Sequence, residues 1–152
     1  MIDSKEYSLE DLVQEIQPPY EDQAHVANML NTLTIYLEKP WREPQLPEFL
    51  IAGFRPILKD FLNVSQAVQE ELVDCLSYLL DPYSDDKPSL DIQIIKDNLH
   101  VLPPSGLVSA IHLIGNERAP DAEARIRPLL THERDSVREA ARDELFEMGL
   151  TV

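Results

Sequence analysis

The spacing of apolar residues predicts a chain built from helices. Within Glu21–Glu38, Val26, Leu30, Leu33 and Leu37 recur every three or four positions and share one helical face. The same spacing predicts eight helices, which span Ser8–Gln17, Glu21–Glu38, Pro47–Leu62, Ser65–Leu80, Leu90–Leu99, Ser105–Gly115, Pro120–Leu130 and Asp135–Met148. No segment alternates apolar and polar residues for long enough to predict a strand, so we expect an all-α fold.

Capping residues stand at several of these boundaries. Ser8, with Asp11 three positions later, has the pattern of a capping box. Ser65 and Asp135 are predicted to be N-caps. Because glycine tolerates the left-handed backbone that ends many helices, we predict C-caps at Gly115-Asn116 and Gly149.

Part of the sequence is repeated. Residues 54–58, Phe-Arg-Pro-Ile-Leu, return as Ile-Arg-Pro-Leu-Leu at 126–130, and Pro56 is expected to kink or split its helix. The helix that follows each copy carries matching apolar positions. They are Val68, Leu72, Leu76 and Leu79 after the first copy, and Val137, Ala141, Leu145 and Met148 after the second. A shorter echo uses Leu107, Ile111 and Ile114. Such periods are typical of stacked helical hairpins, which bury their apolar stripes against one another.

The last helix resembles a known repeat. Asp135, Val137, Arg138, Ala141 and Leu145 follow the pattern of the second helix of a HEAT repeat of the short bacterial type, and Gly149 completes it. The resemblance is clearest over residues 105–149 and weaker over 54–80. It implies a single domain over residues 1–152, folded as a right-handed solenoid of helical hairpins. Proteins of this fold mostly bind other macromolecules, and the resemblance brings no active site with it.

The composition adds a strong charge. The chain has 152 residues, 43% of them hydrophobic, and a formal net charge of −15. Residues 1–100 hold 19 acids and 7 bases, so most of the excess lies there. A field of this sign repels phosphate backbones and attracts basic partners, although acidity also keeps many proteins dispersed. Each arginine near the C-terminus has an acid close in sequence, which favours a surface of ion pairs over a nucleic-acid site.

Residue patterns typical of catalysis are missing from the sequence. Four histidines lack helical pair spacing, so we expect neither metal nor cofactor, and His112 is interpreted as a partly buried structural residue. Cys75, the single cysteine, is expected to be a buried thiol. Glu70, Glu71 and Asp74 are interpreted as favouring a helix N-terminus. With no leader and no long apolar run, we expect a cytoplasmic protein without a membrane span.

These observations favour a non-catalytic interaction protein. Its most concrete form is an acidic immunity or inhibitor protein that masks a basic partner, such as a toxin nuclease. A scaffold or adaptor subunit is the main alternative, and a HEAT-like lyase subunit or a base-excising enzyme would need a pigment pocket or a basic groove. The oligomeric state stays open.

The partner-binding face is predicted on helices three, five and seven, taken as the second helices of their hairpins. The carboxylates expected to bind the partner are Asp60, Asp85, Asp86, Asp91, Asp97 and Glu123. Trp41, which lies near Tyr36 and Phe49 in sequence, is either an exposed anchor or a plug between hairpins.

Overall fold

The computed structural model describes residues 7–38, 48–80 and 90–151, and its secondary structure over these segments is entirely helical. The α-helices are α1 (Leu9–Glu15), α2 (Gln23–Glu38), α3 (Glu48–Lys59), α4 (Gln66–Leu79), α5 (Gln93–Lys96), α6 (Pro104–Glu117), α7 (Ala122–Ile126) and α8 (Asp135–Glu147). Short 3₁₀ helices are η1 (Phe61–Asn63), η2 (Leu99–Val101) and η3 (Arg127–Thr131). For the described residues, the all-α prediction is confirmed.

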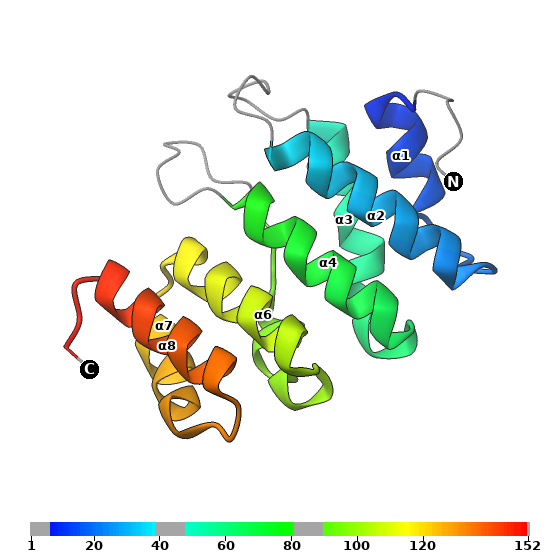
Figure 1. Cartoon of the computed structure of the whole chain (residues 1–152). Coiled ribbons are helices and arrows are strands. Elements are labelled where there is room, and N and C mark those ends of the chain that lie inside the picture. The colour runs from blue at the N-terminus through cyan, green and yellow to red at the C-terminus, as the bar shows by residue number, and fades with distance from the viewer. Residues whose placement is uncertain (1–6, 39–47, 81–89, 152) are drawn as a thin grey trace.

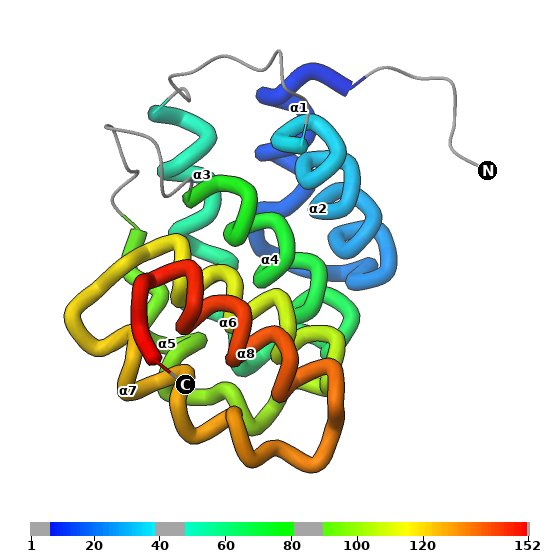
Figure 2. Tube along the Cα trace, turned by 60° about the vertical axis from the view of Figure 1, so that its left-hand side comes forward, coloured from blue at the N-terminus to red at the C-terminus, as the bar shows by residue number. Residues whose placement is uncertain are grey.

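The longer helices α2, α4, α6 and α8 form one row. Each packs on the next, and all four run in the same direction (Figure 1). The other elements occupy a second layer, and Figure 2 shows α3 and α7 on the same side of α4 and α8. In chain order, each row helix follows a helix of the other layer, so α2, α4, α6 and α8 are the second members of successive helix pairs. The assignment of helices three, five and seven as second helices is therefore wrong.

The repeated apolar positions form the core of this row. Leu72, Leu76 and Leu79 of α4 are at most 1% exposed, and the repeated positions Ile111 of α6 and Leu145 of α8 are fully buried. Each leucine removed from water in this way contributes about 2 kcal/mol. The first-copy residues lie on α3 and α4 and the second-copy residues on α7, η3 and α8, so the repeat relates structurally matching pairs.

Two predicted helix starts are confirmed and one is wrong. Ser8 Oγ accepts the Asp11 N–H at 3.1 Å while the Asp11 carboxylate accepts the Ser8 N–H at 3.3 Å, which completes the capping box. Ser65 Oγ caps α4 by accepting the Val68 N–H. Asp135 is not an N-cap, because it is the first residue inside α8 and forms an ion pair with the next turn.

The two predicted C-caps have different outcomes. Gly149 follows the end of α8 with φ +78°, the left-handed backbone that glycine favours. Gly115 is instead buried within α6, which continues to a left-handed cap at Arg118. The Asn116 amide donates to the Ser77 carbonyl of α4 at 2.7 Å, so a neighbouring helix holds this last turn.

The two Arg-Pro copies also differ. α3 remains one α-helix through Pro56, whereas α7 stops at Ile126 and Pro128 lies in η3. Proline removes a backbone donor and crowds the preceding turn. Burial beside the proline does not separate the two copies, since Phe54 and Ile126 are both fully buried, but α3 has 12 residues whereas α7 has only five. The fifth predicted helix, Leu90–Leu99, is likewise reduced to the four residues of α5.

Candidate interaction surface

Three adjacent helices of the row contain no lysine or arginine. The sequences of α2, α4 and α6 contain five carboxylates and no strong base. Four of these carboxylates lie on α2 and α4, on the side of the row that faces away from the second layer, whereas Glu117 of α6 pairs with Lys96. Glu144 of α8 lies on the same outward side. We call Glu38, Glu70, Glu71, Asp74 and Glu144 the acidic row. Because α2, α4 and α6 supply no lysine or arginine to neutralise these carboxylates, the surface attracts cations.

Short polar side chains connect the acidic row across helix boundaries. The contacts are Asn31 Nδ2 to Glu71 Oε2 at 3.4 Å, Ser105 Oγ to Glu70 Oε1 at 2.6 Å, Ser109 Oγ to Asp74 Oδ1 at 3.3 Å and His112 Nδ1 to Glu144 Oε1 at 2.8 Å. Each contact joins neighbouring helices, so the carboxylates are fixed relative to one another.

Crowding of these carboxylates changes their acidity. Partial burial raises the pKa of Glu71, and the nearby charges of Asp74 and Glu70 add to this effect. Burial also raises the pKa of Asp74, with a further contribution from Glu38 on α2. The charged forms are therefore held at a cost, and a cation from a partner would relieve it.

Two other groups complete this surface. Tyr78, which is 42% exposed, lies among the carboxylates, since burial and then the charges of Glu38 and Asp74 raise the pKa of its phenol. His112 lies on α6, which packs between α4 and α8, and its hydrogen bond with Glu144 raises the pKa of the imidazole. The His112 side chain is 46% exposed, so it belongs to the surface more than the sequence suggested.

The predicted partner-binding carboxylates do not form one site. Asp85 and Asp86 lie outside the described residues. The other four have internal partners: Tyr20 Oη donates to Asp60 at 3.1 Å, the Gln93 N–H to Asp91 at 2.9 Å, Arg125 pairs with Asp97 at 2.8 Å and Arg127 with Glu123 at 2.7 Å. They are spread over the second layer and its connections, whereas the acidic row lies on the other layer.

Asp97 belongs to a network that joins α5, α6 and α7. Lys96, whose side chain is 6% exposed, reaches Glu117 at 2.9 Å and Asp121 at 3.1 Å. Burial lowers the pKa of Lys96, but the hydrogen bonds to the two carboxylates outweigh it, and the net shift is upward. Arg125 bridges Asp121 and Asp97 and also donates to the Lys96 carbonyl at 3.1 Å. These ion pairs and hydrogen bonds hold α5 and α7 of the second layer together and attach them to the end of α6.

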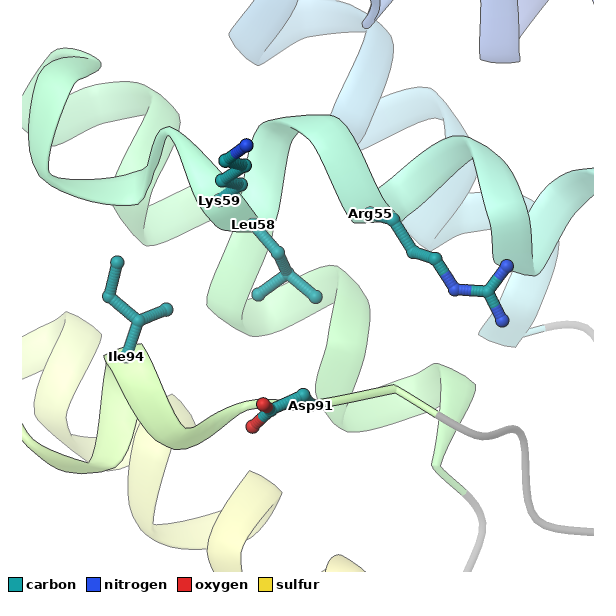
Figure 3. A pocket seen from close by; sticks show the side chains of 5 residues that line it. All are labelled: Arg55, Leu58, Lys59, Asp91 and Ile94. Carbon is teal, nitrogen blue, oxygen red and sulfur yellow. The ribbon is translucent and has the colours of Figure 1, made fainter.

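Asp91 lines an open cavity between α3 and α5. The cavity measures about 460 Å³ and is lined by Arg55, Leu58, Lys59, Asp91 and Ile94. Figure 3 shows Leu58 pointing toward the space, with the Asp91 carboxylate on the opposite wall. The Arg55 guanidinium points away from it, toward the start of α3, where it pairs with Glu48 at 3.6 Å. The polar groups therefore do not converge on the cavity.

Sequence reasoning missed the acidic row. Glu70, Glu71 and Asp74 were assigned to a helix N-terminus, but the first turn of α4 contains no acid, so that interpretation is wrong. Only the row arrangement brings them beside Glu38 and Glu144. The available signal was the lack of lysine and arginine in three of the predicted helices, Glu21–Glu38, Ser65–Leu80 and Ser105–Gly115.

Other expectations have definite outcomes. Cys75 is fully buried, and burial raises the pKa of its thiol to about 12. The expected ion pairs near the C-terminus include Arg125 with Asp121 and Arg127 with Glu123. Trp41 lies outside the described residues. Within the described segments, no group of three or more potential metal ligands occurs.

Comparison with known proteins yields no relative. No family model matches the chain, and neither the curated proteins nor the solved structures contain a match. Among the described residues, none of the helices combines the length and apolarity required to cross a membrane.

Proposed function

We propose that this protein is a non-catalytic binding module that captures a basic protein through the acidic row, as an immunity or inhibitor protein would mask a cationic toxin. The observation that carries this proposal is the lack of lysine and arginine on α2, α4 and α6, which lie side by side. The net charge of −15 adds long-range attraction that speeds encounter with a cationic partner.

The parallel packing of the row helices supports this role and is consistent with the proposed HEAT-like repeat architecture. Four row helices that run in one direction, with related apolar positions on α4, α6 and α8, are what stacked hairpins would produce. Such stacks offer broad surfaces rather than deep pockets. The outward side of the row matches that description, because no described element packs over Asn31, Tyr78 or His112, all of which are exposed.

Two carboxylates at the centre of the surface provide the test. The variant Glu71→Gln/Asp74→Asn removes two negative charges from the acidic row. The control Glu10→Gln/Glu133→Gln removes two exposed charges elsewhere and gives the same formal charge. The probe is an amphipathic arginine-rich peptide, compared with the same peptide in which glutamine replaces every arginine.

We expect the acidic-row variant to bind the arginine peptide at least about 10-fold more weakly, or about 1.4 kcal/mol. The control variant should lose no more than about 2-fold, and amide chemical-shift changes should map to α2, α4 and α6. Folding is an internal check, because neutralising carboxylates with raised pKa values should not lower the melting temperature. Equal losses in both variants would show that only total charge matters and would refute the site.

The partner is sought by co-purification from the native host at low salt. A basic protein retained by the wild type, released by added salt and lost with Glu71→Gln/Asp74→Asn would support the proposal. Recovery of acidic proteins alone, or of none, would argue against an inhibitor of a basic toxin.

A further inference from the structure

The outer side of α8 carries an exposed aromatic side chain at the end of the row. α2 is flanked by α1 and α4, and α4 and α6 each have a row helix on both sides, whereas among the described elements α8 has a row neighbour only in α6 (Figure 1). Phe146 on this side is 75% exposed, the most exposed large hydrophobic side chain of the described residues. It lines an open groove of about 640 Å³ together with Leu150.

Charges of both signs surround Phe146. Arg142 and Asp143 are exposed and lie one turn before it, in the same groove. Within the described segments Arg142 has no ion-pair partner, whereas Arg125, Arg127 and Arg138 are all paired. α8 thus differs from the other row helices, which lack arginine, and exposes Arg142 beside Asp143, a pair of opposite charges among further carboxylates at Glu139 and Glu147.

From this geometry we propose that the outer side of α8 is a dimer interface that pairs with the same surface of a second copy. Two antiparallel copies of α8, related by a two-fold axis beside residues 142–146, place Arg142 of each copy against Asp143 and Phe146 of the other. The arginine then gains an ion pair and a contact with an aromatic face, while both phenylalanines are withdrawn from water. Such a two-fold contact closes on itself and stops at the dimer.

The area available limits the strength of this dimer. A helix of 13 residues is about 20 Å long. The surface buried in the dimer would therefore be no more than about 1,200 Å² in total, the small end of specific interfaces. The charge of −15 on each chain also opposes association at long range. We therefore expect a weak dimer that strengthens as salt screens this repulsion. Binding of a basic partner to the acidic row has the opposite salt dependence, so the two interfaces are distinguishable.

Sedimentation equilibrium tests the dimer. The apparent mass should rise with protein concentration from 17.4 kDa toward twice that value, and more readily at high salt. Phe146→Ala should weaken association at least about 10-fold. The matched control is Leu62→Ala on η1, a residue that is 49% exposed on another surface, and this variant should leave association unchanged.

The charge pair provides a second test. Arg142→Asp should weaken the dimer, and the swap Arg142→Asp/Asp143→Arg should restore it in part, since the exchange of both signs regains the ion pair but not the contact of Arg142 with Phe146. Circular dichroism verifies that each variant folds. A mass that stays at the monomer value, grows past the dimer, or ignores Phe146→Ala would overturn the proposal, and so would a swap that restores none of the lost association. The acidic-row variant should dimerise normally.

Discussion

The buried ammonium of Lys96 gives the sharpest test of how the second layer is held together. Lys96 has two ionic partners, Glu117 and Asp121, whose side chains are 24% and 38% exposed. Removal of one partner from a fully buried ion pair costs about 3–5 kcal/mol. Because Asp121 stays in place and water reaches both carboxylates, we expect Glu117→Gln to cost less, about 2 kcal/mol.

The reverse change should be milder. Lys96→Met keeps most of the side-chain volume, and the two carboxylates that it leaves can turn toward water, so we expect a loss of about 1 kcal/mol. The double variant Lys96→Met/Glu117→Gln no longer contains the uncompensated ammonium. Its loss of unfolding free energy should therefore be smaller than the sum of the two single losses by about 1 kcal/mol. Urea unfolding followed by circular dichroism measures all three free energies. Single effects that add within about 0.3 kcal/mol would refute the coupling of Lys96 to Glu117.

The pH dependence follows from the direction of the Lys96 shift. Its pKa is raised above 10.5 in the folded protein, so the network contributes fully below that value and is lost as pH rises through the folded pKa. Wild type and Lys96→Met should therefore differ in stability at neutral pH and converge in strongly alkaline solution; they should also converge in acid, where Asp121, whose pKa is lowered by Lys96, gains its proton. A difference that disappeared near neutral pH would contradict this assignment.

Two further predictions concern buried positions in the row. A Cβ at Gly115 would lie 2.1 Å from Glu144 Oε2, so Gly115→Ala should displace that carboxylate and lower the pKa of His112 toward its ordinary value of 6.5, as proton NMR would measure. The gain in helix propensity, about 1 kcal/mol, should offset the loss of the His112–Glu144 pair. That pair stabilises the protein below pH 6.5, and its contribution disappears as pH rises through the folded pKa of His112. An unchanged His112 titration would disprove the contact between Gly115 and Glu144. Cys75, with a pKa of about 12 and no exposure, should not react with a disulfide reagent at pH 8 until the protein unfolds, and a rapid native reaction would contradict its burial.

Neighbouring helices explain several differences between the predicted and observed elements. α6 extends past the predicted end at Gly115 because Asn116 bonds to α4 and Glu117 reaches Lys96 on α5. Neither partner is adjacent in sequence. The Arg-Pro motif likewise has two outcomes: α3 continues as an α-helix through Pro56, whereas α7 ends before Pro128.

The acidic row depends on tertiary structure in the same way. Glu38, Asp74 and Glu144 are far apart in the chain, and only the parallel packing of α2, α4, α6 and α8 brings them to one surface. The carboxylates predicted from sequence were mostly polar positions of helices taken as the second helices of their hairpins, and in the structure Asp97 pairs with Arg125 and Glu123 pairs with Arg127.

The sequence by itself determined the helical class, the capping box at Ser8, the N-cap at Ser65 and the burial of Cys75. These features depend on apolar spacing and on contacts within a few residues, which the local chain specifies. Tertiary structure alone decided the length of α5, the burial of Lys96 and the composition of the charged surfaces. Those depend on which distant side chains meet, because an ion pair or a buried ammonium is stabilised only by the partner that packing supplies.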